Sequence, residues 1–445
     1  MSTPRLGIPV LVLAAVICGL LALPAMASSQ ARIVRLSDVE GTVQIDRDAG
    51  QGYERAFLNM PIVQGTKLWT KEDGRAEVEF EDGTVVRIVP NTKINFSELS
   101  LRDSGGKLNT LNLQEGTAYV NFEGKKDDEF VINFGRESAR LTHPAHFRVE
   151  MDDAEATLAV LKGSVDLQGP SGSFEVGKKQ TATFDLADND RHEIAKNFEQ
   201  DPYDNWDKQQ AQYHDRYFNN SSYSNSNYPY SYGVSDLNYY GSYYNVPGYG
   251  NMWQPYFAGP GFDPFMNGAW CWYPGYGYTF VSAYPWGWMP YRYGTWVFVP
   301  NFGWGWQPGG WNTWATIPRT INPPNRFVTP QPPVTGGRQT VVVGHPPVMP
   351  GNAPRRVMIT QGSAGLGIPR GTVRNLPDIS QRVATQGTAT VRTAAPTRSV
   401  WMGPSSGSSS RGMGSSGRVS APSPHMSAPH SSAPSHSAPA SSSKH

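Results

Sequence analysis

Two histidines, His143 and His146, are the first residues in this sequence whose type and spacing could do chemistry. Imidazole nitrogens bind zinc, but a zinc site needs three or four ligands, and no cysteine lies near this pair. The two histidines lie in a predicted corner between strands, and the spacing names no third ligand. We therefore predict no metal site here.

Acidic runs at residues 127–129 and 152–153 are a second candidate for metal binding. They lack the alternating ligands and central glycine of a calcium loop, so we interpret them as solvated loops. The sequence also lacks a glycine-rich phosphate loop, a nucleophile elbow and a zincin helix. It therefore predicts no catalytic residues, no cofactors and no enzyme. Paired carboxylates for sugar hydrolysis stay open, because their separation in space cannot be read from spacing.

An internal repeat carries the largest set of candidate binding residues. Residues 268–280 match residues 294–306, and a Trp-rich stretch at 286–293 separates the two copies. Alternating aromatic residues punctuated by glycine and proline predict twisted hairpins. The rings either stack on sugars as a ligand-binding surface or form the core of a small module. The candidate ligand-binding residues are Trp270, Trp272, Trp286, Trp288, Trp296, Trp304 and Trp306.

The elements that must position these residues follow an apolar leader. One basic residue, Arg5, precedes an apolar stretch at 6–23, and the small-x-small site Ala25-Met26-Ala27 follows it. This pattern predicts a cleaved secretory signal over residues 1–27. An uncleaved anchor is the alternative, because the stretch approaches the roughly 20 residues that span a bilayer. After cleavage we predict no transmembrane span.

Charge divides the mature chain into two kinds of sequence. Residues 28–200 hold 21 basic and 30 acidic residues, whereas residues 301–445 hold 13 basic residues and one acidic residue. The Pro-, Ser-, Gly- and Arg-rich tail at 317–445 has too few large apolar residues to offset the entropy of ordering, so we predict disorder. Such a tail attracts anionic polymers or serves as a solubilising spacer. Specific nucleic-acid binding is not predicted for a secreted protein.

Between the leader and the tail, the sequence predicts four further segments. Short strands bounded by glycine and asparagine predict an all-β domain at 32–186. A linker at 187–219 contains one amphipathic helix over 201–219, because its aromatic residues recur every three or four positions and would dock on the β domain. A Tyr-, Asn- and Ser-rich connector follows at 220–250. A Trp-rich module, predicted as a small β module, spans 251–316.

Several motifs in the β domain occur in a familiar order. They include Gly41-Thr42-Val43, the hairpin at 76–88, Gly116-Thr117 and the stretch at 160–165. In this order they resemble the FecR domain across residues 32–184. The resemblance implies an all-β sandwich or solenoid outside the cytoplasm. The best-known members relay a signal from an outer-membrane receptor to a sigma factor, but they carry a cytoplasmic anti-sigma segment for which residues 1–7 leave no room.

The sequence therefore predicts a non-enzymatic, secreted or periplasmic FecR-domain protein that acts in binding or scaffolding at the bacterial cell envelope. Its predicted partners are a cell-wall glycan or an envelope protein, with anionic polymers as partners of the basic tail. A sensor or signal-relay component is the alternative function, and a glycan-processing enzyme is the second. The ligand, the oligomeric state and the exposed side of each aromatic strand stay open.

Overall fold

The computed structural model describes residues 32–170, 172–187, 191–197, 199–218, 228–325, 328–334, 340–344 and 356–393. The predicted signal at 1–27 and most of the predicted tail lie outside these residues. No helix within the described ranges is long and apolar enough to cross a membrane.

The strands of residues 34–195 form a β domain of two layers that share one long strand, β9 (Lys107–Phe122). Its first half pairs with β8 (Lys93–Leu101) in one layer, and its second half pairs with β12 (Ala145–Met151) in the other. Gly116 lies where β9 changes layers, and a side chain there would strike Asn91 and Thr92. The all-β prediction is confirmed.

The first layer has the order β3 (Glu54–Arg55), β2 (Val43–Asp46), β5 (Lys67–Thr70), β8, β9, β10 (Glu129–Phe134), β11 (Glu137–Leu141), β14 (Ser164–Gly169) and β15 (Gly172–Gly177). The second layer has the order β4 (Pro61–Ile62), β1 (Val34–Glu40), β6 (Arg75–Glu79), β7 (Val85–Ile88), β9, β12, β13 (Glu155–Lys162), β16 (Thr181–Asp185) and β17 (Arg191–Ala195). Buried phenylalanines join the layers: the rings of Phe134 and Phe184 lie 6.0 Å apart.

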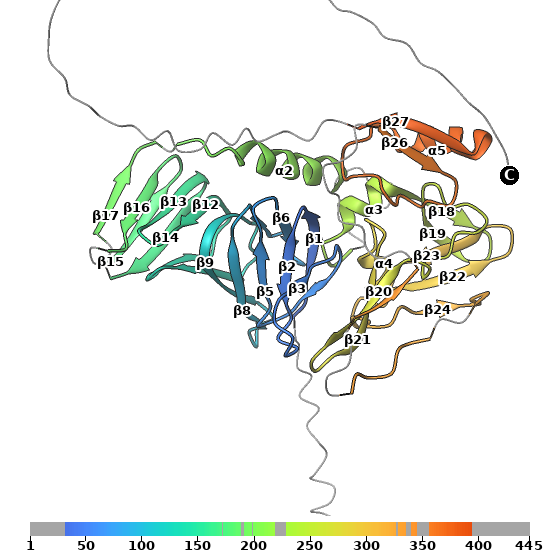
Figure 1. The fold of residues 1–445 in the computed structure, drawn as a ribbon, viewed down its shortest axis with the longest axis horizontal. Helices are drawn as coiled ribbons and strands as arrows, with labels where there is room; N and C mark the ends of the chain where they lie inside the picture. The colour runs from blue at the N-terminus through green and yellow to red at the C-terminus, as the bar shows by residue number, and fades with distance from the viewer. Residues whose placement is uncertain are drawn as a thin grey trace, which may run out of the picture. The chain divides into compact units, whose positions relative to one another are not determined.

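Helix α2 (Asp204–Phe218) confirms the predicted amphipathic helix and its docking on the β domain. Trp206 on this helix is buried against Val89 and Tyr119. The side chain of Arg75 lies over the Trp206 ring, with its guanidinium carbon 5.2 Å from the ring centroid. Figure 1 shows α2 running along one edge of the strands β6, β9 and β12.

The repeat in the Trp-rich module forms two hairpins, as predicted. In the first copy β20 (Gly268–Tyr273) pairs with β21 (Gly277–Ser282), and Trp270 faces Phe280. In the second copy β22 (Thr295–Val299) pairs with β23 (Gly303–Gln307), and Trp296 faces Trp306. The two copies thus have the same register, and a residue with a positive φ angle lies in each turn, Gly275 in the first and Asn301 in the second.

The two hairpins belong to separate sheets. The remaining elements of this module are α3 (Val234–Tyr240), β18 (Gly241–Val246), β19 (Gly250–Pro255), α4 (Met289–Arg292), β24 (Thr320–Ile321) and β25 (Thr340–Val343). One sheet has the order β18, β19, β23, β22, β24, and the other has the order β21, β20, β25. From here on, the Trp-rich module means residues 228–344.

Three predictions about this half of the chain are wrong. The connector predicted at 220–250 contains α3 and β18 in its described part. The single predicted helix is joined by α3, α4 and α5 (Leu376–Gln386) in the described residues. The predicted tail boundary at 317 is too early, because α5, β26 (Arg356–Thr360) and β27 (Thr388–Arg392) form a folded segment, which we name the C-terminal clasp (residues 356–393).

A single hydrophobic core connects the three parts. Buried side chains in contact extend from the β domain through the Trp-rich module to the C-terminal clasp, where Ile359, Ile368 and Val383 are buried. The clasp packs on aromatic side chains of the Trp-rich module, which cover the apolar residues that the clasp itself supplies.

Candidate functional site

A network of buried charged side chains lies on the outer face of the hairpin β6–β7. Alternation in this hairpin predicts that Glu77 and Glu79 point away from the core of the β domain into solvent. They do point away from that core, but they are 0% and 4% exposed, because α2, α3 and the clasp cover them. We name this network the charged junction: Arg35, Glu77, Glu79, Arg87, His146, Asp207, His214, Asp236 and Arg370.

Glu77 is the centre of the charged junction. Its Oε2 accepts a hydrogen bond from Arg87 at 2.8 Å, and its Oε1 accepts one from Arg370 at 2.6 Å. Ser37 donates to Oε1 at 2.7 Å, and His214 Nε2 lies 3.0 Å from the same oxygen. Four side chains from β1, β7, α2 and the clasp therefore converge on one carboxylate.

The charged junction continues toward α2 through Arg87. The guanidinium of Arg87 donates to Asp207 at 2.8 Å, and the second Asp207 oxygen lies 3.0 Å from His146 Nε2. Arg87 and Asp207 are both 1% exposed. Each charge in this arm thus has a partner of opposite sign, the condition under which buried charges are tolerated.

A second arm ties the β domain to the Trp-rich module. Arg35 forms ion pairs with Glu79 at 2.9 Å and with Asp236 of α3 at 2.7 Å. It also donates to the main-chain oxygen of Pro285 at 3.0 Å. The neighbouring Asn59 donates to two further main-chain oxygens of the same segment, those of residues 282 and 284.

The C-terminal clasp closes the network through Arg370. Its Nε and Nη2 donate to the two oxygens of Asp236, each at 3.2 Å, and Nη2 also donates to the main-chain oxygen of Ser37 at 2.7 Å. The guanidinium carbon lies 5.1 Å from the ring centroid of Tyr213, whose hydroxyl donates to Asp236 at 2.7 Å. One arginine thus contacts all three parts of the fold.

These neighbours set the ionisation of the buried carboxyls. Burial by itself would raise the pKa of Glu77, but the positive charges of His214, Arg370 and Arg87 outweigh it and hold that pKa well below its usual range. The pKa of Asp236 is lowered in the same way: Arg370 and Arg35 outweigh the effect of burial. The charged junction therefore holds ionised carboxylates at neutral pH.

Asp38 at the edge of the charged junction behaves in the opposite way. Loss of hydration, followed by repulsion from Glu40, raises the pKa of Asp38 to about 7, although Arg370 and Arg75 pull it down. This carboxyl therefore changes protonation near neutral pH.

Glu77, Glu79 and His214 also form a possible metal-ligand set, because one ligand atom of each lies within 4.8 Å of the others. Arg87 and Arg370 already bind both oxygens of Glu77, however, and their positive charges would repel a cation. The donor set therefore fits an ion-pair network better than a metal site.

The two histidines of the predicted strand corner, His143 and His146, have different surroundings in the structure. His146 points into the charged junction, whereas His143 is exposed and its Nδ1 lies 3.0 Å from Thr142 Oγ1. Of the acidic residues predicted to be solvated, Asp128 is 4% exposed, and it accepts hydrogen bonds from the main-chain nitrogens of Lys107 and Lys125. It therefore orders a turn.

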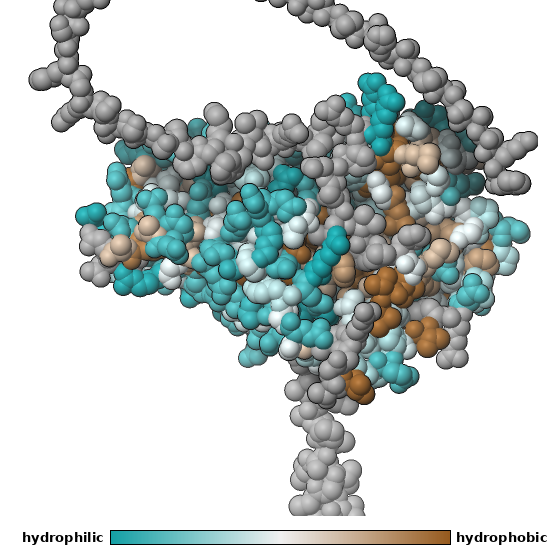
Figure 2. Space-filling model, in the orientation of Figure 1, coloured by the Kyte–Doolittle hydropathy of each residue, from teal (hydrophilic) through white to brown (hydrophobic). Residues whose placement is uncertain are grey.

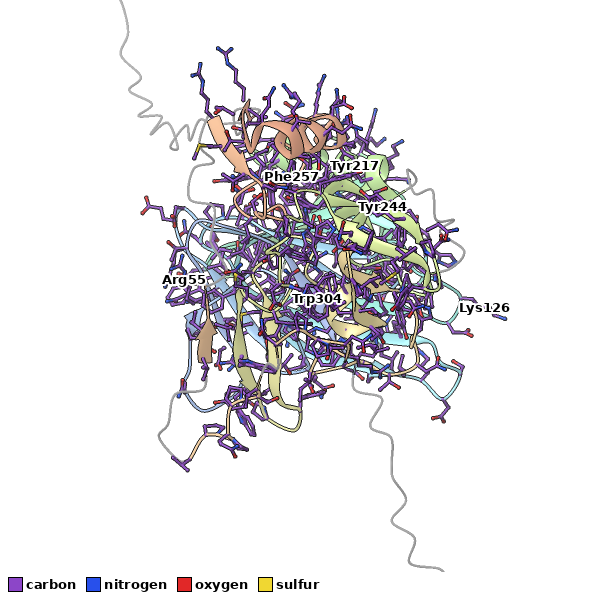
Figure 3. All side chains as sticks on the ribbon, turned by 90° about the vertical axis from the view of Figure 1, so that its right-hand side faces the viewer. Arg55, Lys126, Tyr217, Tyr244, Phe257 and Trp304 are labelled. Carbon is purple, nitrogen blue, oxygen red and sulfur yellow. The ribbon has the colours of Figure 1, made fainter. Side chains whose placement is uncertain are left out.

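The candidate tryptophans lie in the core of their module. Trp286, Trp288, Trp296 and Trp306 are 0% exposed, Trp270 and Trp304 are 2% exposed, and Trp272 is half-buried. Figure 3 labels Trp304 in the interior, among the strands of the module. A ring that stacks on a sugar must be exposed, so this geometry favours the core interpretation and disagrees with a binding surface built from these seven residues.

The free cysteine of the module, Cys271, is buried as well. Burial raises the pKa of the Cys271 thiol to about 11, which leaves it un-ionised at neutral pH.

Sequence reasoning missed the residues that assemble the charged junction. Glu77 and Arg87 are visible as an alternating polar face, but Asp236 lies in the predicted connector and Arg370 in the predicted tail. The hydrogen bond from Arg370 to Glu77 joins residues 293 positions apart. No local pattern in the sequence signals such a contact.

Comparison with protein families decides the nature of the β domain. The family described as FecR protein matches residues 66–166, which include the hairpin β6–β7, the shared strand β9 and β12. Residues 66–166 form a FecR domain. From here on, the name FecR domain is used for the β domain that contains these residues. The predicted resemblance is thereby confirmed. Residues 234–322 of the Trp-rich module match DUF6600, a family of unknown function.

Two solved structures resemble part of this chain, and both are crystal structures of a putative anti-sigma factor from Parabacteroides distasonis. They are 16% and 18% identical to this chain, each with a TM-score of 0.26. Each comparison covers 29% of this chain and 59% of the other chain. Comparison with curated proteins gives no match.

Proposed function

We propose that this protein is a non-enzymatic binding or scaffolding protein of the bacterial cell envelope, in which the FecR domain and the Trp-rich module act as one rigid body. The charged junction carries this proposal. It fills the polar face of the FecR hairpin with residues of the same chain, so that face is not free to receive another protein.

Rigidity follows from the cost of separating the two parts. Opening the interface would leave Arg35, Asp236 and Glu79 without their partners until water replaced them, and it would expose part of the shared aromatic core. Losing one partner of a buried ion pair costs about 3–5 kcal/mol. A body held in this way presents its surface loops at fixed positions, which suits a scaffold or a binding protein.

A sensor or relay component is the second candidate, and the FecR domain itself favours it. In that function the charged junction would have to open or shift when a partner binds. Asp38 lies at the edge of the charged junction, and its pKa is raised to about 7. A change in its surroundings would therefore alter the protonation of Asp38.

Cosedimentation of the mature protein with purified cell walls tests the first proposal. A matched variant replaces the four basic residues beyond 393, Arg398, Arg411, Arg418 and Lys444, with glutamine, so that it changes none of the described residues and removes the basic charge beyond residue 393. We expect both proteins to sediment with walls at moderate salt. Loss of binding in the variant alone would assign the wall contact to charge, and no binding by either protein would contradict a wall-scaffolding function and favour the relay.

A further inference from the structure

The outer face of the C-terminal clasp is basic. Residues 356–393 contain five arginines and a single acidic residue, Asp378. Arg370 points into the charged junction, where it pairs with Glu77 and Asp236. The other four arginines are exposed: Arg356, Arg374, Arg382 and Arg392. One face of the clasp thus secures the fold, and another carries positive charge into solvent.

These four charges are not neutralised within the part of the chain that the structure describes. None of the four guanidiniums forms an ion pair or a hydrogen bond with a described residue. Asp378 lies one helical turn before Arg382 in α5, so it offsets at most one of the charges. Figure 3 shows side chains that end in nitrogen projecting from the clasp, at the top of the view. Figure 2 shows hydrophilic residues at the top of the clasp and hydrophobic residues beneath them, toward the Trp-rich module.

The hairpin of β26 and β27 forms part of this basic face. Arg356 lies directly opposite Arg392 in the register of the two strands, and Met358 lies opposite Thr390. All four side chains are exposed, because the alternate positions of both strands point toward the core. Like charges that lie directly opposite each other destabilise a strand pair. An anionic group that bridges the two guanidiniums would remove this repulsion.

An exposed apolar side chain lies beside the arginine pair. Met358 follows Arg356 by two positions on the same face of β26, and it is 69% exposed. Guanidinium groups donate in a fork that matches phosphate oxygens, so phosphate fits the arginine pair. A soluble polyanion makes no use of an apolar side chain, whereas a lipid surface takes up both basic and apolar side chains of one face. The combination favours a phospholipid surface over a soluble polyanion.

We propose that the outer face of the C-terminal clasp binds the surface of an anionic phospholipid membrane. Lipid phosphates bind to Arg356 and Arg392, and the side chain of Met358 enters the headgroup layer. Arg374 and Arg382 add to the attraction, which falls off within a Debye length. The proposal rests on the proposed function at the cell envelope, for which it names one surface and one partner.

Cosedimentation with vesicles tests this proposal. The mature full chain is sedimented with vesicles of phosphatidylglycerol and phosphatidylcholine in equal parts, and with vesicles of phosphatidylcholine alone. We expect binding to the anionic vesicles only. Each basic residue near an anionic lipid surface strengthens binding about fivefold, so the double variant Arg356→Gln, Arg392→Gln should bind about thirtyfold more weakly. The matched control is Lys178→Gln, Lys179→Gln, which removes the same charge from an exposed turn of the FecR domain and should bind like the wild type.

Met358→Ser separates a membrane from a soluble polyanion. Its control is Ile194→Ser, because Ile194 is an exposed apolar residue on β17 of the FecR domain. We expect Met358→Ser to weaken vesicle binding about three- to tenfold and Ile194→Ser to leave it unchanged. Long-chain polyphosphate serves as the soluble polyanion. Equal vesicle binding by the wild type and the double arginine variant, no effect of Met358→Ser, or binding to polyphosphate without binding to anionic vesicles would overturn the proposal.

Cosedimentation of the same proteins with purified cell walls separates this proposal from the proposed function. If the wild type sediments with walls but not with anionic vesicles, the membrane assignment fails and the scaffold function stands. If the wild type sediments with anionic vesicles but not with walls, the membrane assignment stands and the wall-scaffolding function fails. If it sediments with neither, both fail.

Discussion

Glu77 is the residue on which the charged junction depends most. It is 0% exposed and has contacts with Arg87, Arg370, His214 and Ser37. Glu77→Gln keeps the shape and removes the charge, which leaves two buried guanidiniums without their shared counter-ion. We expect the free energy of unfolding to fall by about 3–5 kcal/mol, measured by urea denaturation at pH 7.

Glu72→Gln is the matched control, because Glu72 is exposed. It should change the free energy of unfolding by less than about 0.5 kcal/mol. Equal, small effects of the two substitutions would show that the charges of the junction do not stabilise the fold.

Asp38 predicts an unusual dependence of stability on pH. Its pKa is raised from 3.8 in the ordinary state to about 7 in the fold, so the folded protein binds more protons than the unfolded chain between these values. The stability that Asp38 contributes is therefore complete below about pH 4 and is lost as the pH rises through 7. Asparagine at this position does not ionise, so Asp38→Asn removes the fall in stability that ionisation of Asp38 causes.

The measurement is the urea midpoint of the wild type and of Asp38→Asn at pH 5 and pH 8. The variant should gain relative to the wild type at the higher pH. A constant difference between the two proteins across this range would contradict the raised pKa.

At the residue scale, the sequence predicts which side chains share a face but not what covers that face. Alternation places Glu77 and Glu79 opposite the core, which is correct. Their burial depends on Asp236 and Arg370, and those residues belong to segments that local composition describes as a connector and a tail. Burial across such separations is a tertiary property, which the alternation of a single hairpin does not contain.

At the element scale, Arg370 is the residue through which the C-terminal clasp pairs with the charged junction. Arg370→Met keeps the apolar stem and removes the charge that pairs with Glu77 and Asp236. We expect the clasp to open more often, because two carboxylates lose a partner. Hydrogen exchange in β26 and α5 should be faster by a factor of ten or more.

Arg374→Met is the control in the same segment, since Arg374 is exposed. Its exchange rates in the clasp should match those of the wild type. Unchanged protection in Arg370→Met would mean that the hydrophobic contacts of Ile368 and Val383 suffice to hold the clasp.

The elements differ in how far the sequence predicts them. The period of the aromatic residues in α2 and the repeated hairpins is local, and both predictions are confirmed. The clasp is not predicted, because the composition of residues 317–445 taken together hides its apolar residues. Its contacts also come from Phe257, Tyr240 and Trp286 of another segment. The sequence leaves open whether the tryptophans form a binding surface or a core, and long-range packing places them in the core.

At the scale of the whole molecule, we expect the FecR domain, the Trp-rich module and the C-terminal clasp to unfold together. Buried side chains of all three parts form one core, and the charged junction pairs residues from each. Separate domains would unfold in separate transitions, whereas a shared core couples them.

Differential scanning calorimetry of the mature protein at pH 7 tests this claim most directly. We predict one endothermic transition whose calorimetric enthalpy equals its van't Hoff enthalpy, and a lower midpoint for the same single transition in Glu77→Gln. Two resolved transitions in the wild type, with Glu77→Gln lowering only one of them, would contradict the single rigid body and return the FecR domain to an independent unit.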